Sequence, residues 1–285
     1  MALAAMLLSL LAHLPVLASV SALDGANRTV SLHAPARRII SLAPHTTELL
    51  FAAGAGPYVV GVTEYSDYPP EAKRIASVGS GVSLDLERIL RLKPDLIVGW
   101  NNGNAIAQLA KLEALGIPVF RSEPHDFTAI ADSLEKLAHL AGTDAVGHAA
   151  AESFRARLQS LREKYRGRPV LRAFYQIWSA PLMTLNDSAI ASAALRLCGA
   201  ENIFGKLPQV TPAVNVEAVL QADPDVILAG SEAKEDAFAA WRRFPALKAV
   251  AHDRLLLIDG ETLNRASPRI LDGTEKLCKQ LDAVR

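Results

Sequence analysis

The chain has 285 residues, with 30 Lys and Arg against 30 Asp and Glu, and 50% of its residues are hydrophobic. This composition is typical of globular proteins and excludes disordered or low-complexity chains, and the zero net charge argues against a nucleic-acid binder. The length predicts one large domain or two lobes of roughly 100–150 residues each.

The first 22 residues carry no charge and consist mostly of Leu, Ala, Met and Val. This run is short for a membrane-spanning helix, and it closes on Val20-Ser21-Ala22, a small-x-small pattern suited to cleavage before Leu23. We therefore interpret residues 1–22 as a secretory signal peptide, with a retained membrane anchor as the alternative. The run lacks the usual basic residue near its start, so the true translation start stays open.

Two segments repeat one pattern at a constant offset of 130 residues, namely Ser83–Val98 and Ala213–Leu228. In each, Asp85 or Asn215 stands at a helix N-cap position, and apolar residues follow at helical spacing until a proline. A short apolar run then predicts a buried parallel strand. The offset is too long for a solenoid, so the repeat predicts two similar α/β lobes.

Other patterns complete this organisation. The stretch from Asp144 to Tyr165 has no proline and predicts a long helix between the lobes, which leaves little room for a large hinge closure. We expect a lobe over 23–143, the connecting helix over 144–167 and a second lobe over 168–285. Strands are expected at 38–42, 58–62, 117–120, 171–178 and 255–258, and helices at 46–53 and 129–141.

The loops after the expected strands should line a crevice between the lobes. They carry aromatic and neutral polar side chains, which suit a bulky, flat, amphiphilic ligand, although core packing is the alternative for each aromatic residue taken singly. These loops are residues 44–46, 64–68, 100–104, 123–126, 178–184 and 261–265.

Cys198 and Cys278 are the two cysteines. An even number in an exported chain favours a disulfide, with two buried thiols as the alternative. Neither cysteine has the CxxC spacing of a zinc or redox site.

Several runs stand in the order found in a known family: Ile40–Leu49, Tyr65–Pro70, Leu86–Ile89, Leu92–Asp95, Cys198–Phe204 and Arg265–Arg269. On these runs the chain resembles the periplasmic binding proteins of bacterial ABC importers, and most closely their cobalamin-binding branch. The same family includes haem and iron-siderophore binders. Tyr65-Ser-Asp-Tyr-Pro-Pro70 and Ala266-Ser-Pro-Arg269 are the runs most specific to the cobalamin branch.

The resemblance implies two Rossmann-like α/β lobes joined by a single long helix, with the ligand crevice between the lobes. It implies a periplasmic, non-enzymatic protein without a cofactor, a resident metal or a nucleic-acid partner, monomeric when free. This protein would capture cobalamin or a related corrinoid and deliver it to an ABC permease and its ATPase subunits.

The resemblance also assigns residues. The ligand contacts correspond to Tyr65, Trp100 and the loop Glu261-Thr262-Leu263-Asn264-Arg265. The family's disulfide falls on Cys198 and Cys278, and its permease-docking carboxylates fall on Glu87 and Glu217. The helix macrodipole is the alternative explanation for an acid in a first helical turn.

Departures from the family pattern leave the cargo open. Thr262 and Leu263 replace two aromatic residues, Thr211 replaces a third, and His45 and His125 add imidazoles near the crevice. We include His45 among the predicted ligand contacts, because a neutral imidazole can coordinate cobalt or haem iron.

The alternatives are haem, or an iron-siderophore held by arginines, for which the candidates are Arg121, Arg265 and Arg269. A hydrolase using His45 or His125 is less favoured, because the sequence has no Gly-x-Ser-x-Gly, His-Glu-x-x-His or phosphate-loop motif.

Overall fold

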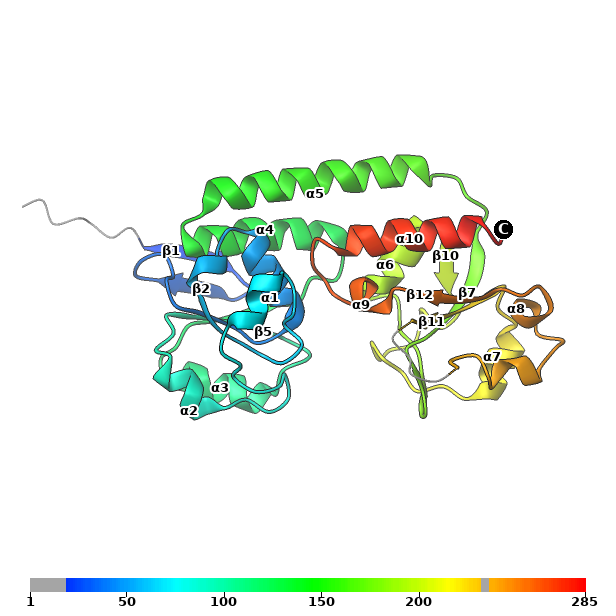
Figure 1. The fold of residues 1–285 in the computed structure, drawn as a ribbon, viewed down its shortest axis with the longest axis horizontal. Coiled ribbons are helices and arrows are strands. Elements are labelled where there is room, and N and C mark those ends of the chain that lie inside the picture. The colour runs from blue at the N-terminus through cyan, green and yellow to red at the C-terminus, as the bar shows by residue number, and fades with distance from the viewer. Residues whose placement is uncertain (1–18, 232–235) are drawn as a thin grey trace, which may run out of the picture.

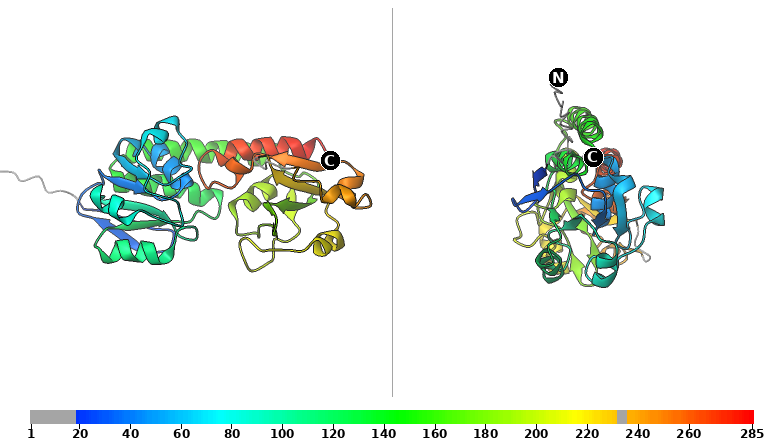
Figure 2. Two further views of the ribbon diagram at one scale, coloured as in Figure 1. Left: turned by 60° about the horizontal axis from the view of Figure 1, so that its bottom comes forward. Right: turned by 90° about the vertical axis from the view of Figure 1, so that its left-hand side faces the viewer.

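The computed structural model describes residues 19–231 and 236–285. They form two α/β lobes, joined by the long helix α5 (Asp144–Lys164), which runs along one side of both lobes (Figures 1 and 2). The predicted architecture of two similar lobes and one connecting helix is confirmed. Within the described residues, no helix is both long enough and apolar enough to cross a membrane.

The first lobe is built on a parallel sheet of order β4-β3-β5-β6. Leu96, Ile97 and Val98 in its centre are fully buried, as expected for a strand covered on both faces. Its strands are β3 (Ile39–Ser41), β4 (Val59–Val62), β5 (Leu96–Trp100) and β6 (Val119–Ser122), and its helices are α1 (Pro44–Ala52), α2 (Leu86–Arg91), α3 (Ile106–Ala114) and α4 (Phe127–Ala141), with short 3₁₀ turns at Gly56–Tyr58 and Pro70–Arg74.

The second lobe contains a parallel sheet of order β10-β7-β11-β12. Its strands are β7 (Leu171–Gln176), β10 (Ala200–Asn202), β11 (Val226–Gly230) and β12 (Leu255–Ile258), with a small hairpin of β8 (Trp178–Ser179) and β9 (Leu182–Met183). Its helices are α6 (Ile190–Leu197), α7 (Val216–Ala222), α8 (Lys248–Ala251), α9 (Gly260–Leu263) and α10 (Ile270–Asp282), with a 3₁₀ turn at Trp241–Arg243.

The sequence repeat is a structural repeat. Its helices, α2 and α7, are both capped as predicted, because Asp85 accepts a hydrogen bond from the Arg88 amide at 2.9 Å and Asn215 accepts one from the Ala218 amide at 2.8 Å. Its strands, β5 and β11, both occupy the third place in their sheets. The two lobes therefore share one strand order, and corresponding loops of each lobe follow corresponding strands.

A hairpin of β1 (Val20–Leu23) and β2 (Thr29–Leu32) precedes the first sheet and was not predicted. Val20 packs into the hydrophobic core, and the buried Asp24 carboxylate closes the turn by accepting the Ala26 amide at 2.9 Å. Most of the predicted signal peptide, residues 1–18, lies outside the described residues. Cleavage before Leu23, which stays a prediction, would remove three of the four residues of β1.

Helix α5 is fixed to both lobes. A β-carbon on Gly147 would lie 2.1 Å from the Ala138 β-carbon, so glycine is what allows α5 and α4 to approach this closely. At its other end, Arg157 contacts Asp272 of α10 at 2.6 Å. The helix ends at Lys164, before the predicted residue 167, and Gly167 just beyond it adopts a left-handed conformation with φ of 72°.

The predicted disulfide is present between Cys198, at the end of α6, and Cys278 in α10. Both cysteines are buried, and the bridge joins residues 80 positions apart within the second lobe. It therefore fastens two helices on the same face of the second sheet.

Candidate ligand-binding crevice

A cavity of about 340 Å³ lies between the two lobes. Apolar side chains form most of its wall, as in sites for organic ligands. The first lobe contributes loops after β3, β5 and β6, as predicted from strand polarity. Its lining residues are Pro44, His45, Trp100, Glu123, Pro124 and His125 from the first lobe, and Ile177, Leu185, Ser188, Ala189, Ile190, Ala191, Val210, Thr211, Asn264, Arg265 and Ala266 from the second.

Trp100 and His45 form an aromatic corner in the first lobe. Trp100 is the last residue of β5 and is 40% exposed, so one part of its indole is available to a ligand. A β-carbon on Gly103 would lie 1.9 Å from an indole carbon, so glycine lets the backbone pass close against the ring. The His45 imidazole meets the indole edge to face, with ring centroids 5.5 Å apart.

The His45 imidazole is neutral at pH 7. Its side chain is buried, and its Nε2 has no hydrogen-bond partner among the described residues. Burial lowers the pKa of His45 to about 4, against an opposing effect of the Glu48 carboxylate and with a further lowering by Arg265. A neutral ring retains a lone pair that can accept a hydrogen bond or bind a metal.

We expect His45 to make the protein less stable in mild acid. The unfolded chain gains a proton at this residue below about pH 6.5, whereas the folded chain does not until about pH 4. Lowering the pH through this range should therefore cost the native state up to about 3 kcal/mol. Urea unfolding of the parent and His45→Gln at pH 7, 5.5 and 4 measures the effect. Equal pH dependence in both proteins would contradict it.

Asn264 and Arg265 also line the cavity, but their polar groups already have partners. The Asn264 amide donates to the Tyr175 hydroxyl at 2.9 Å. The Arg265 guanidinium contacts Glu48 and Asp67 at 3.0 Å each and Glu261 at 2.8 Å. Its charge is therefore compensated within the protein.

The rest of the predicted second-lobe loop is not part of the cavity wall. Residues 260–263 form the short helix α9, in which the Thr262 amide donates to Asp259 at 3.1 Å. Thr262 and Leu263 are buried, and Glu261 contacts Arg265. The predicted contact Tyr65 does not line the cavity either. It is 78% exposed and holds a left-handed backbone with φ of 63°.

Sequence reasoning missed the segment Ser188–Ala191, which lines the cavity at the start of α6. The preceding Asn186-Asp187-Ser188 run was an available signal, since such clusters are typical of the loop before a helix. Asn186 builds this loop by accepting hydrogen bonds from the Ser188 amide at 2.9 Å and the Ser188 hydroxyl at 2.6 Å.

The chain is similar to known proteins over most of its length. A family model described as periplasmic binding protein matches residues 39–262. The chain belongs to the periplasmic binding protein family. A vitamin B12-binding protein of Vibrio cholerae serotype O1 is 42% identical over 248 residues, which cover 87% of this chain and 90% of that protein.

Solved structures show the same likeness. The periplasmic vitamin B12 binding protein of Vibrio cholerae matches with a TM-score of 0.82 at 41% identity, covering 88% of this chain and 98% of that one. A periplasmic heme binding protein from Pseudomonas aeruginosa matches with a TM-score of 0.72 at 26% identity, covering 85% and 91%.

Two carboxylates of this periplasmic binding protein were predicted to be surface groups, one per lobe. Glu87 lies in the first turn of α2 and Glu217 in the first turn of α7, and both are exposed. The helices α2 and α7 lie on the two lobes, on the side away from α5 (Figure 1). The pair therefore presents negative charge from both lobes on one side of the binding protein.

One group of side chains in the binding protein has the spacing of metal ligands. Ligand atoms of Glu135, His148 and Glu152 lie within 4.8 Å of one another, on α4 and α5, and none of these residues lines the crevice. The Arg155 guanidinium contacts both Glu135 and Glu152 at 2.9 Å. An arginine already compensates these carboxylates, so the group is a salt-bridge network between two helices.

Proposed function

We propose that this periplasmic binding protein captures cobalamin or a related corrinoid in its crevice and delivers it to the permease of an ABC importer in the periplasm. It acts by binding, as a monomer, and catalyses no reaction. The observation that carries the proposal is the apolar cavity between the lobes, with the indole of Trp100 and the neutral imidazole of His45 in its wall. Its vitamin B12-binding relatives cover nearly the whole chain.

The charge of the crevice favours a ligand without strong negative charge. The three arginines considered for an anionic siderophore are all paired with carboxylates. Arg265 contacts the carboxylates of three residues, as described above. Arg269 contacts the Glu48 carboxylate, and Arg121 contacts the Glu113 carboxylate at 2.9 Å. Binding an anionic chelate would require breaking these pairs, so the observations disfavour this cargo.

The attachment of α5 to both lobes supports a largely preformed site. Its contacts with α4 and α10 attach it to both lobes and limit large hinge movements, so ligand binding reorders few groups. Affinity then comes mainly from burying a large, flat ligand against apolar walls.

Haem is the second candidate, because the neutral His45 imidazole lines the crevice and imidazole nitrogens bind haem iron. Calorimetric titration with cyanocobalamin and, separately, haemin distinguishes the two. Saturable one-to-one cobalamin binding with weak haemin binding is expected. Tight haemin binding without a cobalamin response would overturn the corrinoid proposal and favour haem.

Trp100 should contribute directly to affinity. Trp100→Ala removes the exposed indole face, and we expect about a tenfold rise in the cobalamin Kd. Trp100→Phe, which keeps a smaller ring, should give an intermediate Kd, so the series separates stacking from general damage. Calorimetry measures all three proteins, and an unchanged Kd in Trp100→Ala would place the ligand elsewhere.

A further inference from the structure

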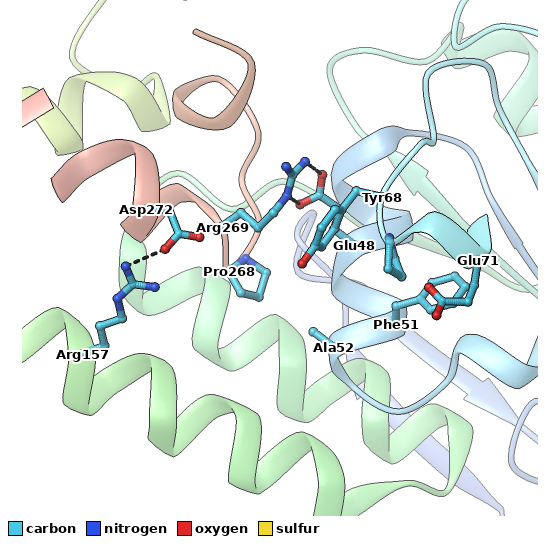
Figure 3. A pocket seen from close by; sticks show the side chains of 10 residues that line it. Glu48, Phe51, Ala52, Tyr68, Glu71, Arg157, Pro268, Arg269 and Asp272 are labelled. Atoms are coloured by element: carbon cyan, nitrogen blue, oxygen red, sulfur yellow. Dashed lines mark hydrogen bonds and ion pairs between the residues drawn. The ribbon is translucent and has the colours of Figure 1, made fainter. Parts of the chain in front are cut away.

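A buried carboxylate joins the two lobes beside the crevice. Glu48 lies in α1 of the first lobe and is 3% exposed. Its partners come from the segment Arg265–Arg269 of the second lobe, immediately before α10 (Figure 3). A carboxylate so deeply buried persists as an ion only when partners replace its water.

Both Glu48 oxygens are fully engaged by the second lobe. The Arg269 guanidinium donates one hydrogen bond to each oxygen, from Nε to Oε2 at 2.9 Å and from Nη2 to Oε1 at 2.5 Å. Arg265 Nη1 donates to Oε1 at 3.0 Å, and the Ser267 hydroxyl donates to Oε2 at 2.5 Å. Burial alone would raise the pKa of Glu48, but hydrogen bonds from Arg269, Ser267 and Arg265 keep that pKa below its ordinary value. The group is therefore an anion held by charge-assisted bonds.

The same segment also reaches a second loop of the first lobe. Arg265 Nη1 contacts Asp67 at 3.0 Å, and the Arg269 guanidinium lies over the Tyr68 ring, 4.0 Å from its centroid. The loop Tyr65–Pro70 of the first lobe and the segment Arg265–Arg269 of the second thus meet across the lobes beside Glu48.

The Glu48 cluster, meaning Glu48, Asp67, Arg265, Ser267 and Arg269, lies between two cavities. Arg265 lines the ligand crevice. Glu48 and Arg269 line a second cavity of about 600 Å³, which also borders Arg157 of α5 (Figure 3). A small movement of one lobe against the other would separate these partners and leave two guanidinium groups and a carboxylate unpaired while they are still largely buried.

We propose that Glu48 is the positioning residue that sets the orientation of the lobes, and with it the width of the crevice and the spacing of Glu87 and Glu217. Helix α5 joins the lobes along one side, whereas the Glu48 cluster joins them beside the crevice itself. The proposal extends the proposed function, but it depends on no particular ligand, because every group in the cluster belongs to the chain.

Pulsed electron paramagnetic resonance of the full ligand-free protein tests it. Spin labels on Glu87→Cys and Glu217→Cys report the spacing of the lobes, and the native cysteines do not react because they form the disulfide. We expect one narrow distance distribution in the labelled parent and a distribution at least twice as wide with Glu48→Gln added. Glu71→Gln is the matched control, because Glu71 lines the same 600 Å³ cavity outside the cluster (Figure 3).

An unchanged distribution in Glu48→Gln would overturn the proposal, and so would equal broadening in Glu71→Gln. Should Glu48→Gln fail to fold, Arg269→Lys serves the same test, since lysine keeps the positive charge but cannot donate both hydrogen bonds to the Glu48 carboxylate in the bidentate geometry of arginine. The measurement uses no ligand, so a failed cobalamin titration would overturn the proposed function and leave this result standing.

Discussion

Replacing Glu87 and Glu217 together by lysine should abolish cobalamin uptake through the importer while leaving the cobalamin Kd of the binding protein unchanged. Both carboxylates are exposed in first helical turns, one on each lobe, on one side of the molecule. If each carboxylate pairs with a basic group of the permease, removing or reversing one charge weakens the free energy of docking by about 2–5 kcal/mol, and losing both charges removes docking. Uptake into proteoliposomes and calorimetry of the free protein measure the two quantities.

Glu163→Lys is a matched control, because Glu163 is an exposed glutamate near the end of α5, away from α2 and α7. It should leave both uptake and affinity at the parent level. A raised Kd in the Glu87 and Glu217 double variant would instead place these residues in ligand binding, and normal uptake would remove their docking role.

Removal of the disulfide should have the largest effect on stability. Cys198→Ala with Cys278→Ala releases a closed loop of about 80 residues, which stabilises the native state by about 4.5 kcal/mol in the chain-entropy model. We expect a fall of about that size in the free energy of unfolding and of about 10 °C in Tm. Urea unfolding with and without reductant measures it. Reductant should destabilise the parent and not the double variant, and a loss below about 1 kcal/mol would contradict the prediction.

The regular elements could be predicted because local sequence encodes their ends. Asp85 and Asn215 cap helices with their own side chains, and Pro94 and Pro224 end the same helices before a buried strand. The start of the β1–β2 hairpin could not be predicted from such local signals. Its first strand follows the apolar leader without a charged or turn residue to mark the boundary.

The candidate site was only partly predictable. Trp100 ends β5 and His45 follows β3, so strand polarity alone places them at the crevice. Thr262 and Leu263 also follow a strand, but the Asp259 cap folds them into a helical turn with buried side chains. Glu48 gave no signal as an inter-lobe residue, because its partners lie 217 to 221 residues away in sequence.

The two lobes share a strand order, but they present different side chains to the crevice, and one of these differences falls on a single position of the repeat. Trp100 ends β5, and Gly230 ends β11 at the equivalent position of the repeat. Trp100 lines the crevice, whereas Gly230 is not among the residues of its wall. Two identical walls would hold an asymmetric ligand equally well in either of two opposite poses. The unlike walls of this crevice lift that degeneracy, so the cargo should be presented to the permease with one particular face forward.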